Sequence, residues 1–304
     1  MADWTTADIP PLTGNTVIIT GTGGLGYEDA LALSGKGAEV ILAGRNAGKG
    51  AEAVSAIKAR YRMARIGFEV LDLASLASVA DFAARFLATH SSLDILINNA
   101  AVMAPPLRQT TADNFELQFG TNYLGHLALT GRLLPILRST KGARVVNLSS
   151  VAHRSGKINF QDLQSSQRYQ PWAAYGQSKL AMLMFALELQ RRSDANGWAL
   201  MSNAAHPGYS RTDLIANGPG ATSFAASIMK ITKIFSQSAA DGALPTLFAA
   251  TDPNAKGGAY YGPNGFYESK GAPAPSFIAP QAKDALAAAK LWDESIKLTG
   301  VRFS

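Results

Sequence analysis

The chain contains no cysteine. Without thiols it can form neither a disulfide nor a thiolate metal site, and a reducing cytoplasm is the compartment that such a composition favours. Histidine is scarce as well: only four occur, at positions 90, 126, 153 and 206, and no two stand in an HxxH or HExxH pattern. We therefore expect no bound metal, and in particular no zinc enzyme.

Long apolar runs are also missing. No stretch reaches the roughly 18 apolar residues of a membrane span, and the opening segment, MADWTTADIPPLTG, has early acids and lacks the apolar stretch of a secretory signal. Apolar residues nevertheless make up 47% of the 304 positions, which is enough for a full hydrophobic core. We expect one folded cytoplasmic domain, residues 1–304, with no membrane span.

The formal net charge is +6, and acids are rare where the bases gather. Between Arg45 and Arg65 the sequence holds six basic residues, and Glu52 is the only acid there. No nucleic-acid-binding motif accompanies them, so we do not expect a DNA or RNA surface. A phosphorylated small molecule is the anionic partner that this cluster suits.

Short apolar runs alternate with longer helical patterns. The runs are continuously apolar, which indicates strands buried on both faces. We expect strands at 16–20, 38–44, 66–73, 93–98, 143–150 and 198–207, and helices at 24–36, 47–62, 75–90, 113–138 and 173–194. This order predicts an α/β fold: a single-domain Rossmann-type doubly wound parallel sheet with helices on both faces. Ligands of such a sheet bind at the carboxyl ends of the strands.

The segment TGTGGLG lies between the first expected strand and the first expected helix. Three of its glycines have G-x-G-x-x-G spacing. The first permits a tight turn, the second lets backbone N–H groups approach a pyrophosphate, and the third lets the helix pack on the strand. The cofactor-binding turn that we predict consists of Gly21, Thr22, Gly23, Gly24, Leu25 and Gly26.

The second expected strand is followed by Arg45 and Asn46. NAD-binding sites usually place an acid at this point, where it binds the ribose hydroxyls, and no acid is adjacent here. A guanidinium instead suits a 2′-phosphate. The sequence therefore predicts NADP(H) as the cofactor.

Tyr175 and Lys179 have Y-x-x-x-K spacing near the start of an expected helix, so they share one face. A cation one turn from a phenol is expected to lower the phenol pKa from about 10. Tyr175 could then donate and accept a proton near neutral pH.

Polar residues end most of the expected strands, which is where this kind of sheet holds its ligand. The residues at these ends are Asp72, Asn98, Asn99, Ser149, Ser150 and His206, and Asn122 lies within the long expected helix.

From about Leu12 to Leu214, these residues and their order resemble the short-chain dehydrogenase/reductase family. The segments NNAAVMAPP, TNYLGH, SSVAH, HPG and YYGPNGF are most similar to its retinol-dehydrogenase-like branch. Bacterial secondary-alcohol dehydrogenases that reduce bulky ketones are also similar over the whole length.

The resemblance implies a catalytic group of four residues. Tyr175 is the implied acid/base, and Lys179 holds the nicotinamide ribose and tunes the tyrosine. Ser150 hydrogen-bonds the substrate oxygen, and Asn122 positions a water in a proton relay. The further implied cofactor contacts are Asp72, Leu73, Asn99, Ala100, Pro207, Gly208 and Thr212.

Two departures from the family pattern leave questions open. The usual loop, T-G-x-x-x-G-x-G, is one residue longer than residues 20–26, which puts local phosphate contacts in doubt. Ser150 and Tyr175 are 175 − 150 = 25 residues apart, more than in compact members, so Ser149 stays an alternative for the substrate contact. We interpret His126 and His206 as packed structural residues, and His153 as an alternative residue lining the pocket.

Residues 210–236 combine glycines with apolar side chains. We interpret them as an apolar lid over the nicotinamide, the alternatives being an ordinary amphipathic helix or a subunit contact. The predicted reaction is NADP-dependent hydride transfer between nicotinamide and a lipophilic ketone or secondary alcohol, catalysed by a homo-oligomer. A catalytically silent NADP-binding regulator and a sugar-nucleotide epimerase of the same fold remain alternatives.

Overall fold

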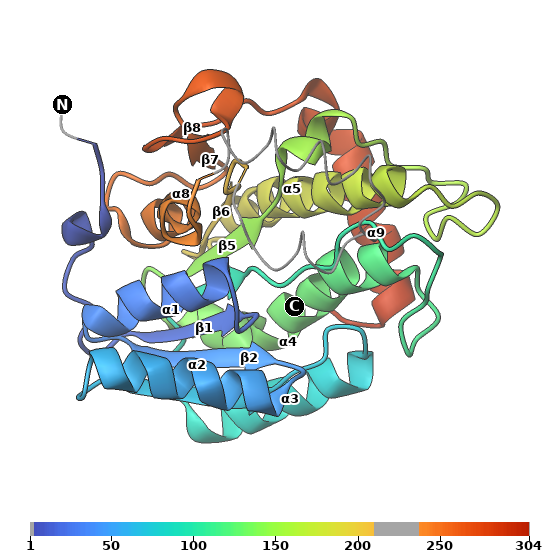
Figure 1. Ribbon diagram of the computed structural model, residues 1–304. Coiled ribbons are helices and arrows are strands. Elements are labelled where there is room, and N and C mark those ends of the chain that lie inside the picture. Colours follow the sequence, from blue (N-terminus) through green and yellow to red (C-terminus); the bar gives the residue numbers. More distant parts are fainter. Residues whose placement is uncertain (1–2, 210–236, 304) are drawn as a thin grey trace.

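The computed structural model describes residues 3–209 and 237–303, which form an eight-stranded sheet in the order β3-β2-β1-β4-β5-β6-β7-β8 (Figure 1). The strands are β1 (Thr16–Thr20), β2 (Glu39–Gly44), β3 (Arg65–Val70), β4 (Ile95–Asn98), β5 (Arg144–Leu148), β6 (Met201–Ala205), β7 (Tyr260–Pro263) and β8 (Pro273–Pro275). Neighbours from β3 to β7 pair in parallel, and β8 pairs antiparallel with β7. The expected parallel sheet is thus confirmed except for this last edge strand.

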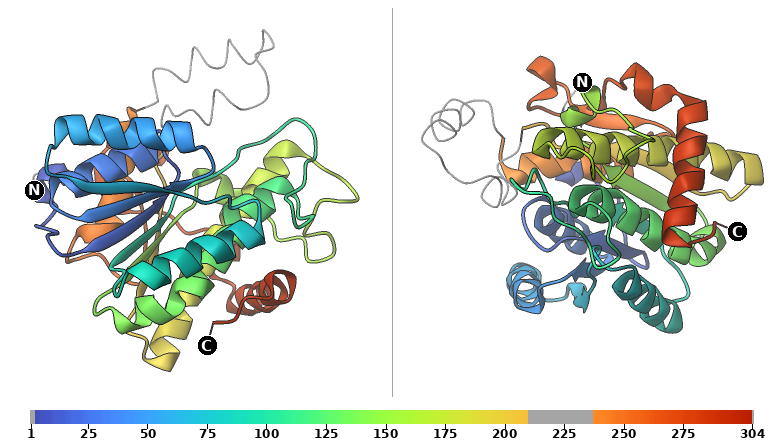
Figure 2. Two further views of the ribbon diagram at one scale, coloured as in Figure 1. Left: turned by 90° about the horizontal axis from the view of Figure 1, so that it is seen from below. Right: turned by 90° about the vertical axis from the view of Figure 1, so that its right-hand side faces the viewer.

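Helices cover both faces of the sheet because its central strands are apolar on both sides. In β1, for example, Val17, Ile18 and Ile19 are all fully buried. One face carries α1 (Leu25–Gly35), α2 (Ala47–Arg60) and α8 (Ala239–Thr251); the other carries α3 (Leu76–Thr89), α4 (Gly125–Ser139) and α5 (Pro171–Asn196). A last helix, α9 (Ala285–Thr299), packs outside α5 (Figure 2).

The strand order reverses between β1 and β4. The chain builds outward from β1 through β2 to β3, then returns to the centre as β4. The loops that follow β1 and β4 therefore diverge to opposite sides, leaving a crevice at their carboxyl ends. This switch point fixes where a ligand of the doubly wound sheet binds.

Several expected boundaries are wrong. The third and fifth strands end at Val70 and Leu148, so Asp72 and the two serines lie in the loops beyond them. The helix expected from 113 starts later, because the Glu116 carboxylate accepts the N–H groups of Gln118 (2.9 Å) and Phe119 (2.7 Å). A π-helical segment, η2 (Phe119–Leu124), then precedes α4.

The C-terminal elements α8, β7, β8 and α9 were outside the expected ranges. Among the described residues, none of the helices is both long and apolar enough to cross a bilayer. The expected lid at 210–236, with Thr212, lies outside the described residues.

Candidate active site

The glycine-rich segment forms the predicted turn between β1 and α1. Gly21 has φ +94°, a left-handed conformation that favours glycine. A Cβ added at Gly26 would lie 2.5 Å from the carbonyl oxygen of Gly21 and 2.8 Å from Asn99 Nδ2. Gly24 occupies the N-cap of α1 with no side-chain hydrogen bond, so the first N–H groups of this helix are left for another acceptor. The shorter loop therefore keeps the strand-turn-helix geometry.

Thr20, at the end of β1, joins this turn to the next strand. Its hydroxyl oxygen accepts the N–H groups of Asn99 (2.9 Å) and Ala100 (3.0 Å), and Asn99 Nδ2 donates to the Thr20 carbonyl (2.8 Å). These hydrogen bonds hold Asn99 and Ala100 against the glycine turn. The structure thus places both beside the glycine turn, and their contact with a cofactor stays a prediction.

His126 also belongs to this junction. Burial lowers the pKa of His126 to about 4, so the ring is neutral. Its Nδ1 lies 2.8 Å from the carbonyl oxygen of Asn122 and must donate there, so Nε2 accepts from the Thr20 hydroxyl at 2.9 Å. His126 is packed, as expected, and its ring also links η2 to Thr20, where the glycine turn begins.

The residues after β2 and β3 form the opposite end of the crevice. Arg45 is exposed directly after β2, and the Asn46 side chain caps α2 by accepting the Lys49 N–H at 3.0 Å. Asp72 accepts the Ala74 N–H at 2.9 Å, while Leu73 is buried. Asn46 and Asp72 thus each have one side-chain oxygen engaged in local structure, whereas the Arg45 side chain is exposed.

Tyr175 lies in the first turns of α5, which Pro171 begins. It is 7% exposed. Burial raises the pKa of Tyr175 to about 12, and the Ser150 side chain offsets part of that rise. The expectation of a lowered phenol pKa is therefore wrong for this structure, because desolvation of the buried phenol outweighs this offset.

Lys179 is placed one turn further along α5, as the spacing predicted. Its Nζ donates to the carbonyl oxygen of Leu148 at 3.0 Å and lies 5.8 Å from the centroid of the Tyr175 ring. Burial lowers the pKa of Lys179 to about 8. The ammonium thus faces the ring and the end of β5 rather than the phenol oxygen.

The two serines after β5 point in different directions. Ser149 is buried and its Oγ donates to the carbonyl oxygen of Lys179 at 2.7 Å. Ser150 is half-buried and begins η3 (Val151–Arg154), accepting the Ala152 N–H at 3.2 Å. Because Ser149 Oγ is already bonded to the Lys179 carbonyl, Ser150 is the better placed of the two for a substrate contact, and that contact stays a prediction.

Asn122 lies in η2, and its side-chain amide is fully engaged. Oδ1 accepts the Val102 N–H at 2.7 Å, and Nδ2 donates to the Val102 carbonyl (2.9 Å) and to Ser178 Oγ (3.0 Å). These contacts join the loop after β4 to α5 below Tyr175. The predicted role in a water relay stays a prediction.

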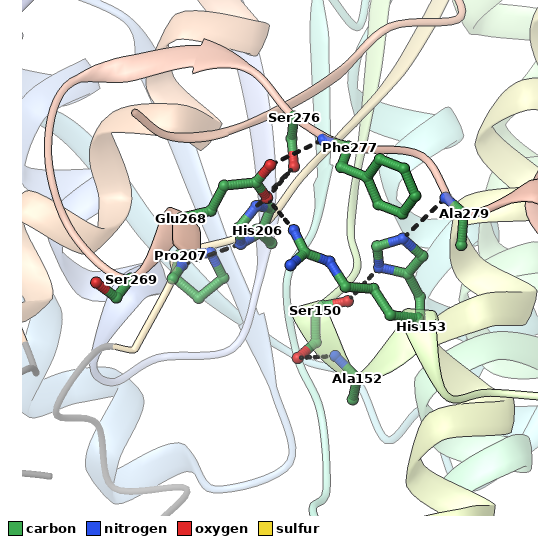
Figure 3. Close-up of polar contacts among 12 residues, drawn as sticks. Ser150, Ala152, His153, His206, Pro207, Glu268, Ser269, Ser276, Phe277 and Ala279 are labelled. Carbon is green, nitrogen blue, oxygen red and sulfur yellow. Dashed lines mark hydrogen bonds and ion pairs between the residues drawn. The ribbon is translucent and has the colours of Figure 1, made fainter. Parts of the chain in front are cut away.

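The segment after β6 holds the predicted Pro207–Gly208 contact. Gly208 has φ +61°, and its N–H donates to His206 Nδ1 at 3.1 Å. Figure 3 shows that His206 belongs to a polar cluster with Glu268, Ser276 and an arginine from the Ser150 segment. The sequence did not point to Glu268. The segment YYGPNGF lies shortly before it in the chain, but no spacing rule links Glu268 to His206.

His153 does not line an open pocket. It is fully buried, its Nδ1 lies 2.7 Å from the Ser150 carbonyl oxygen, and its Nε2 accepts the Ala279 N–H at 3.4 Å (Figure 3). The alternative that gave it a place in the pocket is therefore wrong. His153 instead supports the backbone of the serine.

Comparisons with known proteins agree with this geometry. A family model described as short chain dehydrogenase matches residues 15–219. Polyprenol dehydrogenase of Mus musculus is 39% identical over 304 residues, covering 96% of this chain and 86% of that protein. Retinol dehydrogenase 13 of Homo sapiens is 38% identical over 299 residues, covering 95% of this chain and 86% of that protein.

Solved structures give the same answer for the fold. The crystal structure of an uncharacterized protein from Mycobacterium Paratuberculosis matches with a TM-score of 0.82 at 41% identity, covering 100% of both chains. A short chain dehydrogenase from Shigella flexneri, solved with NADP, matches with a TM-score of 0.65 at 23% identity, covering 83% of this chain and 98% of that one. With the family model spanning residues 15–219 of 304, the chain belongs to the short chain dehydrogenase family.

Proposed function

We propose that the chain is an NADP(H)-dependent oxidoreductase that interconverts lipophilic ketones and secondary alcohols, with Tyr175 as the acid/base. The observation that carries this proposal is the position of Lys179: its Nζ lies 5.8 Å from the centroid of the buried Tyr175 ring and donates to the Leu148 carbonyl at the end of β5, two residues before Ser150. A phenol and a hydroxyl that lie at the same edge of the sheet can together bind one substrate oxygen.

The residues of the crevice fit a dinucleotide. The tight glycine turn and the start of α1, where no side chain caps the first N–H groups, suit a pyrophosphate. The exposed guanidinium of Arg45 suits a 2′-phosphate. A neighbour of the same fold was solved with NADP, which supports the same choice. When bound, NADP(H) supplies or accepts the hydride at its nicotinamide ring.

The chain's own residues supply the proton and the oxygen site. Ser150 donates a hydrogen bond to the carbonyl oxygen, and Tyr175 transfers its phenolic proton to that oxygen as the negative charge develops. Lys179, charged below its pKa of about 8, stabilises the anionic form of Tyr175 through its place over the ring. Asn122 fixes the loop after β4 against α5, which keeps the floor of the site in place.

The raised pKa of Tyr175 favours ketone reduction at neutral pH. With a pKa of about 12 the phenol is protonated and ready to act as an acid. Reduction is expected to be fastest below pH 8, where Lys179 is also charged, and alcohol oxidation, which needs the phenolate, is expected to rise towards alkaline pH. Parallel pH profiles for the two directions would contradict the assignment.

A lipophilic substrate is supported by the rim of the site. Trp172 is 59% exposed, and its ring meets the Tyr175 ring edge-on with centroids 6.0 Å apart. Relatives with 37–40% identity are named for retinol and polyprenol, both apolar alcohols. A large apolar side chain kept in solvent beside the acid/base suits an apolar substrate that covers it.

Tyr175→Phe tests the proposal. We expect kcat for ketone reduction, followed by nicotinamide absorbance across a panel of bulky ketones, to fall by about 10²- to 10⁴-fold. NADPH affinity should stay near that of the wild type, because the ring still packs. Tyr169→Phe is the matched control, since the Tyr169 hydroxyl donates to the Pro105 carbonyl and accepts from Gln118, both away from the Tyr175 phenol in the chain. A wild type that binds NADPH but reduces no ketone would instead favour a regulator.

A further inference from the structure

Glu268 gathers four donors from separate parts of the chain. Its Oε2 accepts hydrogen bonds from His206 Nε2 (3.1 Å) and Ser276 Oγ (2.6 Å) and pairs with the Arg154 guanidinium. Its Oε1 accepts the Phe277 N–H at 2.9 Å. Burial alone would raise the pKa of Glu268, but the hydrogen bonds from His206, Ser276 and Phe277 lower the pKa to about 2. The side chain is therefore an anion at any working pH.

One arm of this cluster leads to the Pro207–Gly208 turn. Because the Gly208 N–H donates to His206 Nδ1, that nitrogen carries no proton, and the proton on Nε2 faces Glu268 Oε2 at 3.1 Å and Ser276 Oγ at 2.9 Å. The His206 ring is 1% exposed and packs on Gly262, where an added Cβ would collide with it. Glu268 thus selects the tautomer that holds the turn.

The other arm leads to the Ser150 segment. Arg154 closes η3, the short helix that Ser150 begins, and its guanidinium lies 5.5 Å from the centroid of the Phe277 ring. Gln281 donates to the carbonyl oxygens of Arg154 (2.9 Å) and His153 (3.2 Å) from the same C-terminal stretch. The backbone that carries Ser150 is therefore held from the far side by residues around Glu268 (Figure 3).

The backbone around Glu268 is shaped for this position. Tyr267 and Glu268 have φ of +49° and +56°, a left-handed conformation that is uncommon outside glycine and persists where the surroundings impose it. It leaves Tyr267 74% exposed while the carboxylate turns inward. The Glu268 and Ser269 carbonyl oxygens then cover Gly208 so closely that no Cβ fits there, and the Ser269 carbonyl accepts the Tyr209 N–H at 2.9 Å.

We propose that Glu268 is a positioning residue that sets the Ser150 segment and the Pro207–Gly208 turn relative to each other, through Arg154 and His206. We call Arg154, His206, Glu268 and Ser276 the Glu268 clamp. The inference rests on the proposed function, because Ser150 is taken to bind the substrate oxygen and Pro207–Gly208 to contact the cofactor. The Glu268 carboxylate acts through Arg154 and His206, by fixing the distance between the groups that bind substrate and cofactor.

A neutral isostere separates the charge from the shape. Glu268→Gln keeps the size of the side chain but cannot neutralise Arg154 or accept all four donors. We expect kcat for ketone reduction to fall about tenfold and NADPH to bind about five- to tenfold more weakly, the usual size of effects from groups that orient a binding residue. Glu294→Gln is the matched control, because within residues 3–209 and 237–303 the only ion pair of Glu294 is with exposed Lys297 on α9.

Single-arm variants sharpen the test. His206→Asn can still accept the Gly208 N–H but is too short to reach Glu268, so the clamp predicts weaker NADPH binding with kcat little changed. Arg154→Met predicts the reverse split, lower kcat with NADPH affinity within about twofold. The double variant Glu268→Gln/His206→Asn should bind NADPH no more weakly than the single variant with the lower affinity. Both substitutions break the same contact, that between His206 and Glu268.

Hydrogen exchange tests the clamp without turnover. In the ligand-free protein, Glu268→Gln should raise exchange of the amides at 152–156 and at 208–209 by about tenfold, while amides of the central strands stay unchanged. A uniform rise in exchange across the whole chain would overturn the proposal in favour of a merely structural Glu268. Kinetic changes that a loss of stability fully explains would do the same. If the wild type reduced no ketone, the proposed function would fail, whereas the exchange pattern would still decide the clamp.

Discussion

The glycine turn and the Glu268 clamp hold the two sides of the same crevice by different physics. In the turn, Gly21, Gly26 and Asn99 approach so closely that backbone and amide atoms leave no room for a Cβ. In the clamp, one carboxylate holds segments that are 62 and 114 residues away in the chain. The first is set by shape, and the second by charge and hydrogen bonds.

The difference extends to the carboxylates of each region. Asp29, in the helix of the glycine turn, is fully buried, and neither of its oxygens has a hydrogen-bond partner among the described residues. Burial, with a smaller contribution from Glu28, raises the pKa of Asp29 well above its usual value. The pKa of Glu268 is instead lowered to about 2. Acid and alkali are therefore expected to act on the two regions in opposite directions.

The largest expected effect comes from filling the glycine turn. Gly26→Val would place side-chain atoms against the Gly21 carbonyl, which is backbone and cannot move aside. We expect NADPH binding, measured by fluorescence titration, to weaken by more than about a hundredfold. Gly67→Val in β3 is the control, since a Cβ there meets nothing within 4 Å. Normal binding by Gly26→Val would show that shape does not set this side.

A smaller effect is expected at the exposed end of the crevice. A charge-assisted hydrogen bond from Arg45 to a 2′-phosphate contributes about 1.5–3 kcal/mol, so Arg45→Ala should weaken NADPH about ten- to a hundredfold and leave NADH nearly unchanged. Added salt should weaken NADPH more than NADH. Arg62→Ala, another exposed arginine of the basic cluster, serves as control. Equal loss of both cofactors would remove Arg45 from the phosphate site.

The next effect concerns Asp29, whose carboxyl has no hydrogen-bond partner among the described residues. Because the folded-state pKa of Asp29 is raised, wild-type stability should fall as pH rises from the unfolded value, 3.8, towards the folded one. Asp29→Asn should therefore raise the free energy of unfolding by about 1–3 kcal/mol at pH 8, with the gain shrinking towards pH 4. Urea unfolding at several pH values measures it. A gain that does not depend on pH would mean that ionisation of Asp29 is not its cause.

The smallest expected effect is the pH dependence of the clamp. The folded-state pKa of Glu268 is depressed from 4.5 to about 2, so its contribution is present above pH 4.5 and is lost as pH falls towards 2. The difference in unfolding free energy between wild type and Glu268→Gln should be about 1 kcal/mol at pH 7 and vanish near pH 2. A difference in unfolding free energy that does not change with pH would contradict the assignment of this effect to the charge of Glu268.

The sequence predicted the region set by shape far better than the region set by charge. Glycine spacing and the Tyr175–Lys179 pair are local patterns, and local patterns carry backbone constraints within a few residues. Strand and helix centres from β1 to β6 were therefore close to the structure. The clamp has no such pattern, because Arg154, His206 and Glu268 come together only after the sheet has formed.

Two further misses have physical causes. Spacing alone placed a cation near the phenol of Tyr175, but the sign of the pKa shift depends on burial, which spacing does not give. Apolar periodicity likewise extended the helix before α4 back to 113, because it does not register that the Glu116 carboxylate caps the helix three residues later. The roles of the site residues, the homo-oligomer and the cytoplasmic location stay predictions.

The backbone on either side of 210–236 closes on itself. The Gln237 N–H donates to the Tyr209 carbonyl at 2.9 Å, and Gln237 Nε2 donates to the Pro207 carbonyl at 2.8 Å. The fold is thus complete at this junction whatever the length of chain between the two residues, as at sites where insertions are tolerated. We expect insertions or deletions between residues 209 and 237 to leave these two hydrogen bonds in place.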